Sequence, residues 1–284
     1  MKVIPAIDIE ENKVARLYKG NYNRVTFYKD TPAFFTKKFI EFGAKRIHLI
    51  MLSGAKKGHH SKGNQKIIEE VIETKNRLNP KCEIQLGGGI RKPGQVRHYL
   101  STGIDFVIMG TSLLVPILLE NGYTIQDLRF LYQQAGKDFK VEKESPEIEI
   151  IEKLNRDIKK RIIVAIDFIN NEIGLSGWNV TVPILPEFLI QKFIEKGFSR
   201  FLITNIERDG TLEGIDIVPI GRVLIKIDNI REKIEEIIIS GGVKDENDII
   251  ALNSIGYKID GVVIGKAIYD RTIDIKKVIS TFQD

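Results

Sequence analysis

Cysteine and long apolar runs are almost absent from this chain. Its 284 residues contain one cysteine, Cys82, which excludes a disulfide within the chain. Cys82 begins an apolar strand-like run, and this position favours a plain buried thiol over a nucleophile. No uninterrupted apolar segment approaches the ~18 residues of a membrane-spanning helix, and Met1–Pro5 lacks the features of a signal peptide. We therefore expect a cytoplasmic protein with no membrane partner.

Compact clusters of positive charge and of metal ligands are also missing. The formal net charge is +5, but the lysines are scattered over helix-like segments without interleaved aromatic residues, which argues against a nucleic-acid partner. His59 and His60 are adjacent in a cationic loop that has no nearby acid, so solvent exposure is favoured over metal binding. His48 lies inside an apolar run and is expected to be a buried histidine. We expect no metal site.

What the chain does contain is a regular alternation of short β-rich runs and longer amphipathic stretches. Such an alternation indicates parallel βαβ units, and eight units favour an α/β fold of the (β/α)8 TIM-barrel type over an open doubly wound sheet. The expected strands are 2–8, 46–52, 82–87, 105–109, 161–167, 200–205, 236–240 and 260–264. The expected helices lie near 32–43, 64–78, 93–102, 113–135, 184–197, 216–230, 245–255 and 274–282.

An internal repeat supports the barrel. Ala6-Ile7-Asp8 recurs as Ala165-Ile166-Asp167, and Gly88-Gly89-Ile90-Arg91 recurs as Gly241-Gly242-Val243-Lys244. Two further segments, one ending at Arg46 and one ending at Gly110, recur in the same order and at nearly the same offset. We therefore predict two homologous half-barrels, a duplication that an open sheet would not explain.

The two halves differ in length because of an insertion at about 119–160, before the fifth strand. We expect one barrel over 1–284, with a charged loop at 137–146 and an added helix at 147–160. An insertion on the way into a strand is expected near the N-terminal face of the barrel, which governs stability rather than chemistry. A solvated decoration is favoured there, and a partner surface stays open.

Two acids end opposite strands of the predicted barrel. Active sites of such barrels are built at the C-terminal ends of the strands, and Asp8 ends the first strand while Asp167 ends the fifth. The two carboxylates would therefore face each other across the barrel mouth, as an acid/base pair acting on opposite sides of one small molecule. The alternative is that each aspartate only caps a loop or helix.

Glycine turns follow the third, fourth, seventh and eighth strands. Glycine lets the backbone adopt positive φ and approach a ligand closely, and the N–H groups of a helix that begins nearby can bind an anion. Arg91 could add a charge-assisted bond, although steric needs alone also place glycine at such turns. The candidate phosphate-binding residues are Gly88, Gly89, Arg91, Gly110, Thr111, Gly241, Gly242, Gly265 and Lys266.

Further candidates lie on loops of the same face. Arg16 and Lys19, in the long loop after the first strand, could meet a phosphate, or this could be an ordinary surface loop. Trp178, the single tryptophan, could stack on a flat heterocycle or belong to the core. Thr204 and Asp209 could position a ligand or the opposing acid, but Asp209-Gly210 is also a turn signal.

These motifs together resemble an isomerase family of histidine biosynthesis, which acts on phosphoribosylformimino-5-aminoimidazole carboxamide ribotide (the HisA family). The resemblance covers nearly the whole chain apart from the insertion. The sister cyclase family shares the repeat but typically has Cys-Leu-Asp at the first strand and lacks the pattern of 16–22. The resemblance is carried by 4–8, 16–22, 87–91, 177–178, 209–211, 240–243 and 264–267.

The resemblance implies an Amadori rearrangement of an aldose amine to a ketose amine, without a metal or an organic cofactor. It implies that Asp8 is the general base at ribose C2 and that Asp167 is the general acid that opens the furanose ring. Thr204 would assist Asp167, and Trp178 would stack on the substrate. The glycine turns would hold the two terminal phosphates of a bis-phosphorylated substrate.

The chain departs from the family pattern at three strand ends. The family usually has two acids after the second strand, where this chain has Met51 and Ser53. Asn205 stands where the sixth strand usually continues with an acid, and Ser176 stands where Arg or Lys often precedes Gly-Trp. A non-catalytic or substrate-shifted sugar-phosphate-binding paralogue therefore stays open, as does a dual isomerase that also acts on phosphoribosyl anthranilate. Since one barrel could complete the site alone, we expect a monomer.

Overall fold

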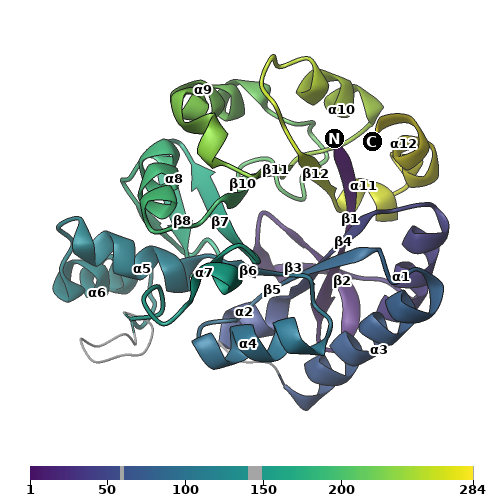
Figure 1. The fold of residues 1–284 in the computed structure, drawn as a ribbon, viewed down its shortest axis with the longest axis horizontal. Coiled ribbons are helices and arrows are strands. Elements are labelled where there is room, and N and C mark those ends of the chain that lie inside the picture. The colour runs from purple at the N-terminus through teal and green to yellow at the C-terminus, as the bar shows by residue number, and fades with distance from the viewer. Residues whose placement is uncertain (58–60, 140–148, 284) are drawn as a thin grey trace.

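Parallel strands close into a barrel in the computed structural model, which describes residues 1–57, 61–139 and 149–283 (Figure 1). The predicted (β/α)8 barrel is confirmed, and the open sheet is wrong, because β1 pairs with β12 and β7 pairs with β10 to complete the ring. The barrel strands are β1 (Lys2–Glu10), β4 (Arg46–Met51), β5 (Glu83–Gly87), β6 (Phe106–Met109), β7 (Ile162–Ile169), β10 (Arg200–Asn205), β11 (Glu236–Ser240) and β12 (Gly261–Ile264).

Helices surround the barrel and cover the outer faces of its strands (Figure 1). None of the helices in the described ranges is long and apolar enough to cross a membrane. The longer helices are α1 (Pro32–Glu41), α3 (Lys62–Leu78), α4 (Pro93–Thr102), α5 (Thr111–Glu120), α6 (Ile125–Gln134), α8 (Pro186–Glu195), α9 (Ile217–Ile227), α10 (Glu246–Asn253) and α12 (Ile275–Phe282). The shorter ones are α2 (Leu52–Lys57), α7 (Arg156–Lys159), α11 (Lys266–Tyr269) and the 3-10 helix η1 (Asp228–Lys233).

The single helix expected at 113–135 is in fact two helices, α5 and α6. A turn separates them at Gly122, whose φ is +100°, a backbone conformation that favours glycine. Thr124 then begins α6, since its side-chain oxygen accepts a hydrogen bond from the backbone N–H of Asp127 at 3.1 Å. The apolar periodicity continues through the turn and hides the break.

Two hairpins extend the opposed strands β1 and β7 beyond the barrel. The expected long loop after the first strand is wrong: β2 (Lys13–Tyr18) and β3 (Asn21–Phe27) form an antiparallel hairpin that pairs with β1. After β7, the strands β8 (Glu172–Leu175) and β9 (Val180–Val182) form a second hairpin. Both hairpins stand at the C-terminal ends of the barrel strands, where they border the candidate site.

The insertion differs from expectation in two ways. Residues 149–160 form turns followed by the four-residue α7, so the helix expected there is wrong, and Ile150, Ile151 and Leu154 are buried. The insertion is also not confined to the N-terminal face, because α6 packs against β9 of the second hairpin. Part of the expected loop, 140–146, lies outside the described residues, as do His59 and His60.

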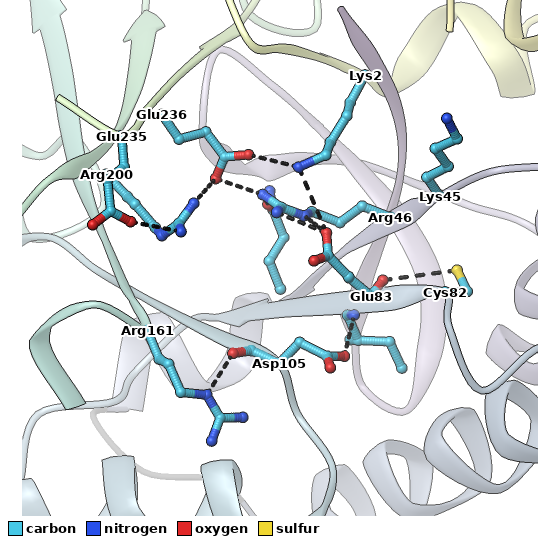
Figure 2. A network of polar contacts seen from close by, with 12 residues as sticks. Lys2, Lys45, Arg46, Cys82, Glu83, Asp105, Arg161, Arg200, Glu235 and Glu236 are labelled. Atoms are coloured by element: carbon cyan, nitrogen blue, oxygen red, sulfur yellow. Dashed lines mark hydrogen bonds and ion pairs between the residues drawn. The ribbon is translucent and has the colours of Figure 1, made fainter. Parts of the chain in front are cut away.

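The barrel interior is filled in layers. Apolar side chains from several strands, such as Ile4, Phe106, Ile163 and Ile238, form a core cluster inside it. Below them, at the N-terminal ends of the strands, the side chain of Arg46 is 1% exposed and pairs with the carboxylates of Glu83 and Glu236 (Figure 2). A buried guanidinium requires such partners. This ionic cluster closes one end of the barrel, so the cavity opens at the other.

Candidate active site

A cavity of about 270 Å³ lies at the C-terminal ends of the barrel strands. It brings together the predicted site residues from both halves of the chain, with the exception of Lys19, which does not line it. Gly20 also lines the cavity, although the sequence analysis did not name it as a site residue. His48, which was expected only to be buried, lines the cavity as well. The predicted residues in the lining are Asp8, Arg16, Gly88, Gly89, Arg91, Gly110, Thr111, Asp167, Trp178, Thr204, Asp209, Gly241, Gly242, Gly265 and Lys266.

Asp8 lies at the end of β1 and is paired with Arg16 of β2. The hairpin register sets Asp8 opposite Ala15, and the Arg16 guanidinium lies 2.5 Å from the Asp8 carboxylate. Burial raises the pKa of Asp8, and the neighbouring positive charge of Arg16 only partly opposes this shift. Arg16 also donates a hydrogen bond to the carbonyl oxygen of Ala6, so the base candidate and its counter-ion are anchored to the same strand.

Tyr269 of α11 supports this pair and was not found by the sequence analysis. Its hydroxyl donates to the carbonyl oxygen of Ala6 at 2.8 Å, and its ring centroid lies 4.9 Å from the Arg16 guanidinium carbon. The ring of Tyr28 packs against it at a tilt of 39°, with 4.6 Å between the ring centroids. A tyrosine three residues after Lys266 carries no motif of its own, so only the fold shows that it reaches Arg16.

Asp167 ends β7 on the opposite side of the cavity. The indole N–H of Trp178 donates to the Asp167 carboxylate at 2.9 Å, and Thr204 is the register partner of Asp167 on β10. Burial raises the pKa of Asp167, and Trp178 and Thr204 only partly offset that shift. A carboxyl group with a raised pKa can hold a proton for general acid catalysis.

Asp209 is the third carboxyl group in the cavity. Burial, followed by the negative charge of Asp8, raises the pKa of Asp209 to about 7. The backbone carbonyl of Asp209 accepts a hydrogen bond from the N–H of Lys19 at 3.2 Å. This bond joins the loop after β10 to the β2–β3 hairpin, so Lys19 helps to hold the rim together rather than line the cavity.

One glycine turn lies between β5 and β6. Gly88 and Gly89 have φ values of +94° and +84°, and a side chain at either position would collide with backbone atoms of Met51 or Gly54. Gly110, the N-cap of α5, has φ −114° and ψ −106°. Arg91 donates a hydrogen bond to the Ala55 carbonyl at 3.2 Å. Backbone N–H groups, a helix start and a cation thus converge on one side of the cavity, as an anion site requires.

The second glycine turn repeats this geometry between β11 and β12. Gly241 and Gly242 have φ values of +91° and +99°, and a side chain at Gly241 would collide with the carbonyl of Asn205. Gly265, the N-cap of α11, has φ −110° and ψ −101°, nearly the values of Gly110. The two glycine turns therefore have matching backbone conformations and line the same cavity.

The departures at Met51, Ser53 and Asn205 lie beside the cavity rather than in its lining. Met51 is fully buried, and the side-chain amide of Asn64 donates to its sulfur and to the Ser53 hydroxyl, each at 3.3 Å. The Asn205 side-chain oxygen accepts from the N–H of Glu207 at 3.1 Å. Neutral hydrogen bonds therefore hold the two strand ends where the family pattern has acids.

Comparison with known proteins agrees with this arrangement. The chain matches the histidine biosynthesis protein family over residues 2–123 and 142–274. It belongs to that family. The expected family membership is confirmed, and the match leaves out residues 124–141, which include the whole of α6.

Curated relatives align over nearly their full lengths. A protein of Sulfurimonas denitrificans is 34% identical over 282 residues, covering 99% of this chain and all of the relative. A protein of Aquifex aeolicus is 31% identical over 274 residues, covering 96% and 95%. One of Thermoanaerobacter sp. is 33% identical over 279 residues, covering 98% and 99%. Each is named a 1-(5-phosphoribosyl)-5-((5-phosphoribosylamino)methylideneamino) imidazole-4-carboxamide isomerase.

Proposed function

We propose that this protein is an aldose–ketose isomerase of histidine biosynthesis, acting on the bis-phosphorylated imidazole carboxamide ribotide named for its relatives. The observation that carries the proposal is the placement of Asp8 and Asp167 on opposite strands of one cavity. Family membership and the isomerase relatives support it. No resident cofactor enters the proposed chemistry, and the described residues hold no group of three His, Cys, Asp or Glu suited to a metal.

In the proposed reaction, Asp167 protonates the furanose ring oxygen as the bond from C1 to that oxygen breaks. The amine nitrogen forms a double bond to C1, and the ring opens. Asp8 then takes the proton from C2, the electron pair of that bond forms a C1–C2 double bond, and the electron pair of the C1–N double bond returns to nitrogen to give an enolamine. Protonation of C1 and loss of the C2 hydroxyl proton give the C2 ketone. Ring opening and deprotonation of C2 each move one proton between the substrate and a carboxyl group, which suits two acids on opposite sides of the sugar.

The two glycine turns would bind the two terminal phosphates and so fix the sugar between the carboxyl groups. The ion pair with Arg16 would hold the Asp8 carboxylate in place beside the sugar. Thr204 would hold Asp167 in place, and Trp178 would stack on the imidazole ring after leaving its hydrogen bond to Asp167.

A turnover assay with the aldose ribotide tests the proposal. Wild type should form the ketose product, and Asp8→Asn or Asp167→Asn should each reduce kcat by about 10²–10⁴-fold while substrate still binds. Wild-type turnover that survives unchanged in both variants would refute the assigned roles. Binding without any wild-type turnover would favour a non-catalytic paralogue, although the missing acids that suggested one lie outside the cavity lining. Turnover of phosphoribosyl anthranilate in addition to the ribotide would identify a dual isomerase.

A further inference from the structure

His48 of β4 lies one layer below Asp8 in the cavity. In the register of β1 and β4, His48 is the partner of Ala6, whereas Ile50 is the partner of Asp8. Since side chains two residues apart on a strand share a face, the imidazole lies on the same face as the candidate base but deeper in the barrel. It is 6% exposed and lines the cavity. His48 is therefore a polar side chain at the floor of the cavity, and the proposed chemistry does not use it.

Gln85 of β5 holds one nitrogen of this imidazole. Gln85 is the register partner of His48 on the neighbouring strand and is fully buried. Its side-chain nitrogen lies 2.7 Å from Nδ1 of His48, and its side-chain oxygen lies 3.4 Å from a guanidinium nitrogen of Arg46 in the ionic cluster below. Because a guanidinium can only donate hydrogen bonds, the amide oxygen has to face Arg46 and the amide N–H has to face His48.

This orientation decides where the imidazole carries its proton. Since the amide N–H donates, Nδ1 of His48 has to accept and cannot itself carry a hydrogen, so the proton of the neutral ring lies on Nε2. A second proton on Nδ1 would set two N–H groups against each other. Burial, together with the positive charge of Arg16, also lowers the pKa of His48 to about 3. The ring is therefore uncharged at neutral pH.

The other ring nitrogen, Nε2, forms no hydrogen bond with any residue that the structure describes. It is also not one of the buried side-chain atoms that lack a partner, so it lies at the cavity surface.

We propose that Gln85 is a positioning residue that fixes the proton of His48 on Nε2, so that His48 donates a hydrogen bond to a sugar oxygen of the ligand at the cavity floor. An N–H donor accepts a hydroxyl or carbonyl oxygen as its partner and repels a cation. On the proposed isomerase function, on which this step rests, the oxygen is the one on C2, because Asp8 acts at that carbon from the layer above. A neutral imidazole can polarise a carbonyl in this way. His48 keeps its proton throughout, so the proton balance of the reaction is unchanged.

Nitrogen NMR of the whole protein without any ligand tests where the proton lies. Long-range proton–nitrogen spectra distinguish the two neutral tautomers of histidine from each other and from the charged ring. The chain has four histidines, and the signal that is missing in His48→Gln identifies His48. We expect His48 to carry its proton on Nε2 and to show no titration between about pH 5 and 8. A proton on Nδ1, or titration near the ordinary value of about 6.5, would overturn the proposal.

The test variant is Gln85→Glu, which keeps the length of the side chain but replaces the N–H donor with a carboxylate. An ionised carboxylate only accepts hydrogen bonds, so Nδ1 of His48 should become protonated in this variant. The control is Gln191→Glu, the same exchange at an exposed position of α8 outside the cavity lining, and its His48 should match wild type. An unprotonated Nδ1 in folded Gln85→Glu, or a protonated Nδ1 in both variants, would overturn the positioning role. The wild-type spectrum decides the tautomer even if Gln85→Glu does not fold.

The kinetic consequence rests on the proposed isomerase function. In Gln85→Glu, kcat for the ribotide should fall by at least about 10-fold while KM changes less, because the wrong tautomer leaves an acceptor where the reaction needs a donor and the glycine turns are untouched. An unchanged kcat in a variant whose Nδ1 is protonated would overturn the donor role of His48. If the wild-type protein shows no turnover, the proposed function fails, but the NMR comparison still decides whether Gln85 fixes the proton of His48.

Discussion

Replacing Arg46 with methionine should destabilise the fold by about 3 kcal/mol. Arg46 lies in the ionic cluster at the N-terminal end of the barrel (Figure 2). Its guanidinium nitrogens lie 2.8 Å from Glu236 and 2.7 Å from Glu83, and the guanidinium carbon lies 4.2 Å from the ring centroid of Phe106. Methionine would keep part of the apolar contact with Phe106 but would remove both ion pairs.

The magnitude follows from what remains after the substitution. Removing one partner of a buried ion pair costs about 3–5 kcal/mol, because the other charge stays buried. The Glu236 side chain is 2% exposed but would keep Lys2 at 3.0 Å and Arg200 at 3.1 Å, whereas Glu83 is 32% exposed and can be hydrated. Neither carboxylate is left wholly unpaired in the interior, which places the loss at the lower end of this range.

Urea denaturation at neutral pH measures this loss as a change in the free energy of unfolding. A loss below about 1 kcal/mol, the value of an exposed ion pair, would refute the reasoning. Lys153→Met is the control, since Lys153 pairs with Glu149 at the surface with both side chains at least half exposed. That substitution should change stability by no more than about 0.5 kcal/mol.

The same cluster predicts a pH dependence. Burial acts to raise the pKa of Glu236, but Arg46 and Lys2 outweigh it, so the pKa of Glu236 is lowered overall. A carboxyl group with a lowered pKa in the folded state stabilises the fold above its unfolded pKa, and this contribution is lost as the pH falls through the folded value. The difference between wild type and Arg46→Met should therefore shrink in acid, as urea titrations at several pH values would show.

Three other substitutions test the site. Because the pKa of Asp209 is raised to about 7 in the folded protein, the folded state loses stability relative to the unfolded state as the pH rises from about 4 to 7. Asp209→Asn should therefore be more stable than wild type at pH 8 but not at pH 4, as thermal unfolding would show. Gly20→Ala, with φ +67° and a collision with Trp178, should lose at least about 1 kcal/mol and shift the tryptophan emission. Gly241→Ala should lose phosphate affinity in calorimetry. Its control, Gly256→Ala, shares a positive φ of +82° but meets nothing within 4 Å, and equal affinities would contradict the anion-site assignment.

The barrel and most of the site could be predicted because their signals are local and repeated. Each barrel strand is a short apolar run between helical patterns. A strand that is buried on both faces has no alternation of apolar and polar residues, so it stands out as a continuous apolar run. Asp8, Asp167 and the glycine turns stand directly at strand ends, so the strand order alone brings them to one face. The family motifs add the chemistry to residues that the topology has already placed.

Other parts depend on contacts that no local pattern encodes. The strand β3 is largely exposed, so its residues lack the alternation of a half-buried strand and were interpreted as a loop. Ile150, Ile151 and Leu154 have the spacing of a helix, but they are buried within turns instead. The helix α6 is distant in sequence from β9, and the packing between them depends on the return of α6 towards the catalytic face.

The ionic cluster around Arg46 gives the barrel a single entrance. With the N-terminal end closed by charged pairs and the middle filled by apolar side chains, any ligand has to arrive and depart through the same mouth. That mouth is bordered by the β2–β3 hairpin and the Trp178 turn, which touch at Gly20. Departure of one molecule must therefore precede arrival of the next.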